Sequence, residues 1–258
     1  MKCTGSFPIK GYIYWRNLAM HACKLCPSPI PAAFILIILW ALAGPHPVLA
    51  EPEASVGKIV AGREQNQRTG TGFYIHPNIL ATSFHVVQGA ETITAELGEG
   101  KVQIRALLAF DPDLDLALLY TPIRGTPLPL GGEFLQPWTK LQTLGFSQGK
   151  SLQKIPVIFE DWERIKGIWH LRIQGPVQPG MSGGPVVNDQ GRVLGMNRYT
   201  SDGSASSRAW AVEIQAVHRT LNQALAQPVF TAVSSFARQT GPGPTLRIED
   251  KSIVITDE

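Results

Sequence analysis

The stretch QPGMSGGPVVNDQGRVLG, Gln178 to Gly195, surrounds its one serine, Ser182, with glycines and prolines. Glycine and proline are poor formers of helix and strand interiors, so their density predicts a backbone held in an unusual turn. Gly183, Gly184 and Pro185 oppose helix propagation directly after the serine, and the strand-like VVN follows them. The stretch therefore predicts a serine on a tight loop that leads into a strand.

Most of the remaining chain consists of short apolar stretches broken by turn signals, which is typical of an all-β barrel or sandwich. A break at GGEFLQPW, residues 131–138, separates two groups of such stretches. The candidate strands of the first group are 57–62, 71–76, 79–83, 101–110 and 116–121, and the second group begins with KLQTLGF and ends with RVLGMN. Two groups predict two packed barrels, over about 55–132 and about 140–212.

The hydrophobic period changes near the end of the chain. Ile214, Val217, Leu221 and Leu225 are spaced to line one face of a helix over about 213–227, which Pro228 ends. Residues 228–258 form a loosely patterned tail, in which TLRIEDKSIVIT, Thr245 to Thr256, is readable as a β-hairpin.

The first fifty residues differ from the rest and predict a secretory signal peptide over 1–50. The segment has basic residues but no acidic one, an apolar run AAFILIILWALAG, and the small residues Val48 and Ala50 before a possible cleavage point. Its basic residues are Lys2, Lys10, Arg16 and Lys24. Met20 is an alternative start, because the segment from there reads as a compact signal by itself. An uncleaved membrane anchor is the other interpretation of the run, although the run is short for a membrane span. We expect an exported protein, periplasmic or extracellular, without stable membrane insertion once the leader is cleaved.

Removal of the leader would change the charge and the cysteine content. Four of the 23 basic residues and none of the 20 acidic residues lie in it, so the exported part is close to neutral and carries no basic footprint for nucleic acid. Cys3, Cys23 and Cys26 also lie in it, so we expect a domain that is stable without disulfides. This distribution excludes a thiol nucleophile and a cysteine-ligated metal, and we expect neither metal nor cofactor.

One interpretation of GMSGG is the G-x-S-x-G pattern of α/β-hydrolases, in which a nucleophilic serine lies between a strand and a helix. Asp202 and His218 follow in the order that this interpretation needs. The chain is, however, a poor match to alternating strands and helices, and a strand rather than a helix is expected after Ser182.

The other interpretation takes histidine first, aspartate second and serine last. His85 lies in ATSFHVV just after a candidate strand, Asp115 lies in DPDLDLALL just before one, and Ser182 follows in QPGMSGGPVV. Together with TGTGFYIH, these blocks resemble those of trypsin-like (chymotrypsin-fold) serine proteases, and most closely the bacterial high-temperature-requirement proteases. The resemblance covers about 55–227 and implies an all-β fold of two six-stranded antiparallel barrels with a C-terminal helix.

The resemblance implies a role for each residue. His85 would take the proton of the Ser182 hydroxyl, and Asp115 would fix the histidine tautomer. The amides of Gly180 and Ser182 would form the oxyanion hole, because glycines let the loop curl inward. Protein or peptide substrates would bind beside them, and the residues assigned to substrate binding are Pro176, Met196, Asn197, Arg198 and Trp210. With no acidic residue at Pro176, an apolar specificity is favoured over cleavage after Lys or Arg.

Two departures from the family limit this inference. Met181 stands where digestive trypsins have an aspartate and the bacterial family usually has asparagine, so the resting shape of the oxyanion loop is left open. Residues 228–258 are too few for the PDZ domain that many relatives carry. We expect a serine endopeptidase that acts through an acyl-enzyme, and the alternative is a latent or inactive protein of the same fold that acts as a binding or stress-sensing module. The sequence leaves the oligomeric state open.

Overall fold

A computed structural model describes residues 52–63, 65–98, 100–200 and 207–240, together with the backbone of two short strands at 245–249 and 252–256. The predicted signal peptide, its alternative start at Met20 and the apolar run therefore lie outside the described residues. So does Asp202, which the α/β-hydrolase interpretation requires.

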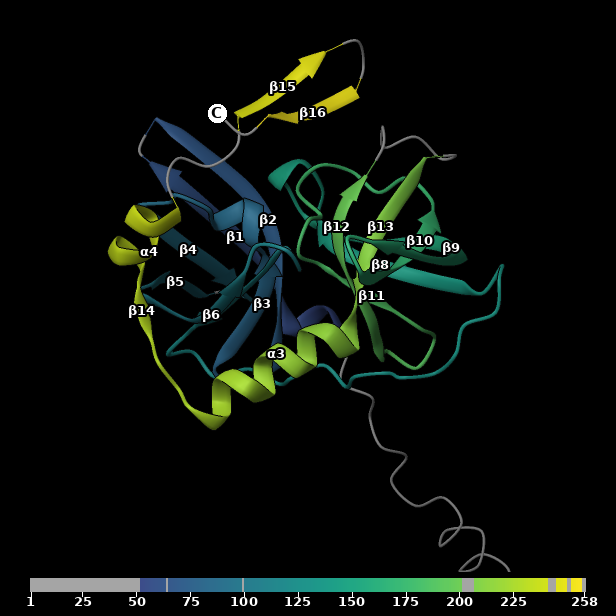
Figure 1. Cartoon of the computed structure of the whole chain (residues 1–258), viewed down its shortest axis with the longest axis horizontal. Coiled ribbons are helices and arrows are strands. Elements are labelled where there is room, and N and C mark those ends of the chain that lie inside the picture. The colour runs from purple at the N-terminus through teal and green to yellow at the C-terminus, as the bar shows by residue number, and fades with distance from the viewer. Residues whose placement is uncertain are drawn as a thin grey trace, which may run out of the picture. The chain divides into compact units, whose positions relative to one another are not determined.

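The first barrel is an antiparallel sheet that curls on itself without closing among the described residues (Figure 1). Its strand order is β14-β6-β7-β3-β2-β1-β4-β5. The strands are β1 (Val56–Arg63), β2 (Asn66–His76), β3 (Ile79–Ser83), β4 (Thr92–Leu97), β5 (Gly100–Ile104), β6 (Ala106–Asp111), β7 (Leu116–Tyr120) and β14 (Thr231–Ala232). The short β14 extends the β6 edge of this sheet, where a closed six-stranded barrel was predicted.

The second barrel is closed, with the strand order β10-β13-β12-β11-β8-β9. Its strands are β8 (Lys140–Phe146), β9 (Leu152–Ile165), β10 (Ile168–Gln174), β11 (Pro185–Val187), β12 (Val193–Thr200) and β13 (Arg208–Glu213). Short helical turns accompany the barrels at η1 (Pro52–Ser55), α2 (Phe84–Val87) and η2 (Ser147–Gly149). The all-β, chymotrypsin-like fold predicted from the sequence is confirmed, with one barrel closed and the other open.

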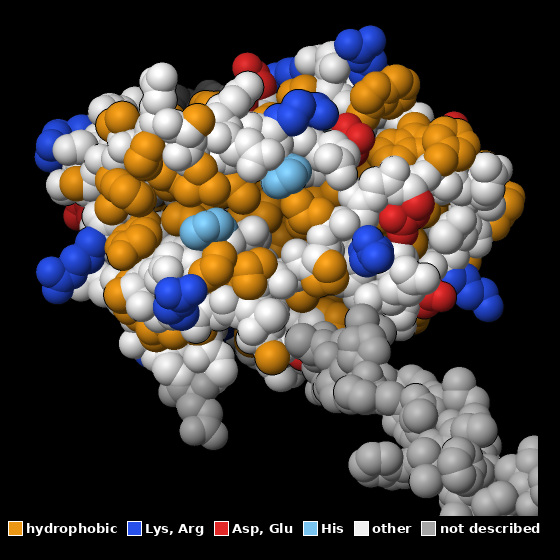
Figure 2. Space-filling view, turned by 90° about the horizontal axis from the view of Figure 1, so that it is seen from below, with side chains coloured by type: hydrophobic (Ala, Val, Ile, Leu, Met, Phe, Trp, Pro, Cys, Tyr) orange, Lys and Arg blue, Asp and Glu red, His pale blue; other side chains and the backbone are white. Residues whose placement is uncertain are grey.

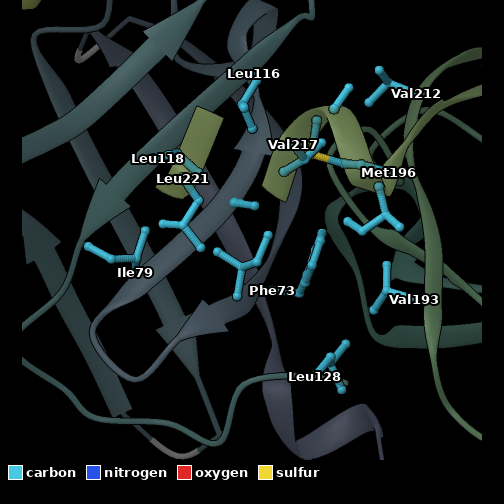
Figure 3. Close-up of a cluster of buried hydrophobic side chains, with 14 of the residues drawn as sticks. Phe73, Ile79, Leu116, Leu118, Leu128, Val193, Met196, Val212, Val217 and Leu221 are labelled. Atoms are coloured by element: carbon cyan, nitrogen blue, oxygen red, sulfur yellow. The ribbon is translucent and has the colours of Figure 1, made fainter. Parts of the chain in front are cut away.

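A shared hydrophobic core joins the two barrels. Figure 3 shows Phe73 and Leu118 of barrel one turned toward Met196 and Val212 of barrel two, with Val217 of α3 between them. Burial of a large apolar side chain contributes about 1.5–3 kcal/mol, so this cluster stabilises the barrels against each other. The catalytic residues predicted on separate barrels are thereby held in one framework.

Helix α3 (Ile214–Ala226) crosses the side of the two barrels that lies lowest in Figure 1. Ile214, Val217 and Leu221 of the predicted apolar face are buried in the shared core. Leu225 is 37% exposed, because it lies in the last turn, where the helix passes the edge of the core. Seen from below, this side shows many hydrophobic side chains with few charges between them (Figure 2).

Part of the predicted loose tail packs against barrel one. After β14 the chain forms α4 (Val233–Thr240), whose Val233 and Phe236 are buried. The Phe236 ring makes edge contacts with Phe84, at 6.0 Å between centroids, and with Phe110, at 5.0 Å. Farther on, β15 (Thr245–Glu249) and β16 (Ser252–Thr256) pair as an antiparallel hairpin over the segment predicted to form one.

Candidate active site

The turn before β7 places Asp115 in a rarely used backbone conformation. One carboxylate oxygen of Asp111 accepts hydrogen bonds from the amides of Asp113 and Leu114, at 2.9 and 3.0 Å. The amide of Asp115 donates to the carbonyl of Pro112 at 3.2 Å. Asp115 has φ of +53°, a region that side chains other than glycine, asparagine and aspartate seldom occupy. The DPDLD sequence therefore forms a local turn that turns the Asp115 side chain back toward β3.

Asp115 is fastened to the start of α2 by three hydrogen bonds. Its carbonyl oxygen accepts from the amide of Phe84 at 2.9 Å, and its Oδ1 accepts from the amide of His85 at 2.9 Å. Its Oδ2 lies 2.8 Å from Nδ1 of His85. Because a carboxylate oxygen only accepts, the ring proton lies on Nδ1 and the neutral histidine has its lone pair on Nε2. The imidazole, with a side chain 26% exposed, presents this base to solvent.

Ser182 lies on a loop that is wedged against barrel one. The amide of Thr71 in β2 donates to the carbonyl of Ser182 at 2.8 Å, and the amide of Gly183 donates to that of Asn197 at 2.8 Å. A Cβ at Gly183, where φ is +83°, would lie 2.6 Å from the amide nitrogen of Ser83, which immediately precedes α2. Only glycine permits this approach, which brings the serine loop against the segment that carries His85.

The Ser182 hydroxyl is partly exposed and hydrogen-bonds weakly, at 3.5 Å, to the carbonyl oxygen of Arg198. Within the described part of the chain it makes no hydrogen bond to His85. The structure therefore joins His85 to Asp115 directly, and it places the loop that carries Ser182 against the segment that carries His85. Catalytic hydrogen bonds are often long in proteins without substrate and tighten only when it binds.

Two amides of the serine loop are left without an acceptor. The amides of Met181, Gly183 and Gly184 donate within the fold, whereas those of Gly180 and Ser182 donate to no group among the described residues. These are the two donors that the sequence predicted for an oxyanion hole.

The carbonyls around Gly180 are held in place by barrel and loop contacts. The amide of Gln148 donates to the carbonyl of Pro179 at 2.7 Å, and the Thr71 hydroxyl donates to that of Gly180 at 2.8 Å. Since N–H and C=O of a trans peptide point in opposite directions, the Gly180 amide points away from η2. Gly180 has φ of +93°, and a Cβ there would lie 2.4 Å from the carbonyl oxygen of Phe146. The loop therefore requires glycine at this position.

Met181, the departure from the family pattern, is fully buried inside barrel two. It packs in a cluster with Leu141, Phe159 and Leu171. Its carbonyl accepts a hydrogen bond from the side-chain amide of Asn197 at 3.3 Å. The loop is thus anchored by apolar packing and a buried amide.

Comparison with known proteins identifies relatives of this fold. Residues 70–196 match the family of trypsin-like peptidase domains, and this range includes His85, Asp115 and Ser182. The chain contains a trypsin-like peptidase domain. It is homologous to bacterial serine proteases, and its fold is that of their crystal structures.

The serine protease Rv3671c of Mycobacterium tuberculosis is 31% identical over 165 residues, which are 58% of this chain and 41% of that protein. A probable periplasmic serine endoprotease, DegP-like, of Marinomonas sp. is 29% identical over 160 residues, 58% of this chain and 34% of that protein. The crystal structure of the active form of the Rv3671c protease superposes with a TM-score of 0.64 at 27% identity, covering 73% of this chain and 89% of the other. This chain therefore spans less than half the length of the curated relatives it matches.

The substrate-binding roles predicted for Met196 and Asn197 do not fit the peptidase domain. Met196 is 0% exposed, because its side chain lies in the core between the barrels. Asn197 is 2% exposed, because its side-chain amide binds the Thr143 hydroxyl and the Met181 carbonyl. The Asn197 side chain thus holds the serine loop, the Met196 side chain packs between the barrels, and neither side chain is exposed to a substrate.

The other predicted contacts lie at different places. Pro176 lines a cavity of about 630 Å³ formed by residues of β8, β9 and β10, and neither His85 nor Ser182 lines it. The Trp210 indole donates to Glu163 at 3.0 Å, and this bond, together with Arg172 and against the opposing effect of burial, holds the pKa of Glu163 below its usual value. The carbonyl oxygen of Arg198 accepts the weak hydrogen bond from the Ser182 hydroxyl.

The Arg198 side chain meets a buried histidine. One guanidinium nitrogen of Arg198 lies 3.0 Å from Nε2 of His170, whose Nδ1 lies 3.0 Å from the Ile168 carbonyl. A carbonyl accepts and a guanidinium donates, so the ring is neutral with its proton on Nδ1. Burial, more than the nearby positive charge of Arg198, lowers the pKa of His170.

Sequence reasoning missed the residues that support α2. The Thr240 hydroxyl accepts from the amide of Gly89 at 3.0 Å, and the Phe236 ring packs on Phe84. The signal was present as the spacing of Val233 and Phe236, which fall on one face of a short helix. In the described residues, no group of three or more His, Cys, Asp or Glu side chains could hold a metal ion. Nor does any described helix have the length and hydropathy needed to cross a membrane.

Proposed function

We propose that this chain is an exported serine endopeptidase that hydrolyses peptide bonds of proteins through an acyl-enzyme, with Ser182 as nucleophile, His85 as general base and Asp115 as its orienting partner. The observation that carries the proposal is the pair of amides, on Gly180 and Ser182, that have no acceptor within the described fold. Donors held ready for a developing oxyanion are the largest single contribution in this chemistry.

The reaction follows from the protonation states. Nε2 of His85 accepts the proton of the Ser182 hydroxyl while the oxygen attacks the substrate carbonyl carbon. The carbonyl oxygen becomes an oxyanion, which accepts hydrogen bonds from the amides of Gly180 and Ser182. The imidazolium then returns the proton to the leaving amine as the C–N bond breaks. Water, deprotonated by the same Nε2, hydrolyses the ester on Ser182.

A latent or binding protein of the same fold is the second candidate. The observation in its favour is that the Ser182 hydroxyl faces the carbonyl of Arg198 and makes no hydrogen bond to His85 in the described residues. Such a protein would need a partner or ligand to shift it to an active conformation. The open amides of the loop favour the enzyme.

The sequence pattern of the first fifty residues and the similarity to known proteases support the proposals on export and on the class of substrate. The first fifty residues have the order of a signal peptide, and one relative carries the name of a periplasmic endoprotease. A near-neutral exported part with protease relatives favours polypeptides over nucleic acid as substrates. We propose no stable membrane insertion after cleavage of the leader.

Covalent labelling with a fluorophosphonate probe tests the proposal. We expect intact and peptide mass to place one label on Ser182 of the full chain, and none on the Ser182→Ala variant. Labelling requires the nucleophile, the base and the oxyanion hole together, so labelling at Ser182 supports the enzyme. A folded chain that the probe does not label would instead support the latent protein.

A further inference from the structure

A second cavity, of about 520 Å³, lies at the end of barrel two where α3 begins. Four separate parts of the chain form it: the inter-barrel segment from Gly131 to Phe134, the β9-β10 hairpin, Leu194 of β12, and the junction of β13 with α3. His85, Asp115 and Ser182 are not among its lining residues. Its volume is in the range of cavities that bind small ligands or single side chains.

Aromatic side chains form the walls of this cavity. Phe134 is 78% exposed and Trp169 is 48% exposed, while Trp162 is partly buried beside them. The indole N–H of Trp162 is buried without a hydrogen-bond partner among the described residues, although buried indoles usually have one. Aromatic surface that is left in contact with water favours a ligand with apolar groups.

The charged residues that line the cavity are all acidic. Glu133, Asp161 and Glu213 line the cavity, and no Lys or Arg does. Asp161 lies 3.9 Å from a guanidinium nitrogen of Arg172, which offsets its charge in part. Among the described residues, Glu133 accepts hydrogen bonds from the neutral groups of Asn188 and Gly132 and makes no ion pair.

Glu213 makes no ion pair within the described part of the chain. The carboxylates of Glu133 and Glu213 therefore have no positively charged partner among the residues that the structure describes.

One aromatic wall already holds a cation. The guanidinium carbon of Arg164 lies 5.8 Å from the ring centroid of Trp169, within the distance at which an aromatic face attracts a positive charge. Trp169 therefore already contacts one arginine, Arg164, which is not among the residues that line the cavity.

We propose that this cavity binds a Lys or Arg side chain of an extended peptide segment of a partner protein, at a place separate from the candidate active site. The aliphatic part of the side chain would lie against Trp162 and Phe134, and its charge would lie near Glu133 and Glu213. A Lys or Arg side chain fits better than a simple ammonium ion because its aliphatic part can cover the exposed ring of Phe134. The cavity would hold a polypeptide at a second point whether or not Ser182 is active.

Calorimetric titration of the full chain as its Ser182→Ala variant tests this proposal without cleavage of the ligand. The probe is the peptide Gly-Leu-Arg-Leu-Gly with acetylated and amidated ends, compared with the same peptide carrying citrulline or glutamate in place of arginine. Citrulline keeps the shape of arginine without its charge. We expect binding with Kd below about 1 mM for the arginine peptide, at least about fivefold weaker binding of citrulline, and weakening with added salt.

Glu133→Gln and Glu213→Gln locate the binding. Each substitution is expected to weaken binding of the arginine peptide by about two- to fivefold, as for loss of an exposed ion pair, and to leave binding of the citrulline peptide unchanged. Glu91→Gln is the matched control, since Glu91 is exposed and pairs with Arg63 away from the cavity. Phe134→Ala should weaken both peptides. Equal binding of arginine and citrulline, no saturable binding, or unchanged binding in both glutamine variants would overturn the proposal.

Discussion

The carboxylate of Asp115 holds His85 at two points, since one oxygen lies 2.9 Å from its backbone nitrogen and the other 2.8 Å from its ring Nδ1. The first bond fixes where the helix α2 begins, and the second fixes the rotation of the ring. Orientation of the base and orientation of its backbone therefore depend on one side chain. That side chain is itself held by a turn with positive φ.

Asp115→Asn should reduce kcat for peptide cleavage by about 10³- to 10⁴-fold, as loss of this carboxylate does in other triads. An asparagine oxygen can still accept from the His85 amide, so its NH₂ group would face Nδ1 and move the ring proton to Nε2. Asparagine also tolerates positive φ, so the melting temperature should change little.

Asp113→Asn is the matched control, because that exposed side chain lies in the same turn and only its backbone amide takes part in the bonds to Asp111. It should keep both activity and stability. Activity of Asp115→Asn within tenfold of the original chain would contradict the assigned role of Asp115.

Gly180→Ala should reduce the rate of fluorophosphonate labelling by about 10²- to 10³-fold, the usual effect of losing an oxyanion donor. The added Cβ would lie 2.4 Å from the Phe146 carbonyl, so the peptide that carries the amide must move.

Gly167→Ala separates this clash from the cost of positive φ. Gly167 has φ of +83°, but nothing lies within 4 Å of a Cβ there. Both variants should lose about 1–3 kcal/mol of unfolding free energy from backbone strain, and only Gly180→Ala should lose labelling. Equal labelling of the two variants would argue against the Gly180 amide as a donor.

Met181→Ala should lower the free energy of unfolding by about 2–5 kcal/mol, because it leaves a cavity inside barrel two. Met181→Leu keeps the volume and should cost less than about 1.5 kcal/mol, with labelling of Ser182 retained. Urea unfolding measures the first quantity. If Met181→Ala were as stable as the original chain, apolar packing would not be what anchors the loop.

The order of His85, Asp115 and Ser182 was predictable because each lies in a short local motif beside a strand. The faces of β12 were not predictable in the same way. Met196 and Asn197 are adjacent and point to opposite faces, but both faces of this strand are covered, one by barrel one and α3 and the other by the barrel interior. Alternation of polar and apolar residues identifies a buried side only when the other side meets water.

The segment after Pro228 was underestimated for a different reason. Its helix has only eight residues and little intrinsic stability, since short helices form through tertiary packing. Phe236 is informative only once Phe84 and Phe110 are known to lie nearby, and these come from distant parts of the sequence.

Phe236→Ala should accordingly lower the free energy of unfolding by about 3–5 kcal/mol, because a fully buried ring is removed from barrel one. Phe134→Ala is the control, since that ring is mostly exposed, and its effect should stay within about 0.5 kcal/mol. Denaturant midpoints at equal slope provide the comparison. Similar losses in the two variants would mean that α4 does not belong to the core of barrel one.

Stability should decline at mildly acidic pH because of His170. Its side chain is fully buried, and burial followed by the charge of Arg198 lowers its pKa below 6.5, while the Ile168 carbonyl and the carboxylates of Glu163 and Asp115 oppose the shift. Between the lowered pKa and 6.5, the unfolded chain binds the proton that the folded chain does not. The contribution of neutral His170 to the free energy of unfolding is therefore complete above pH 6.5. It is lost as the pH falls, by at most about 1.4 kcal/mol for each pH unit.

Urea unfolding at about pH 7.5 and about pH 5.5 measures this loss. His170→Gln should lose less unfolding free energy between these two pH values, because glutamine can still accept a hydrogen bond from Arg198 but does not titrate. His218→Gln is the control, since His218 lies partly exposed on α3, and it should keep the original pH dependence. Should His170→Gln lose as much stability on acidification as the unchanged chain, the dependence must come from other groups.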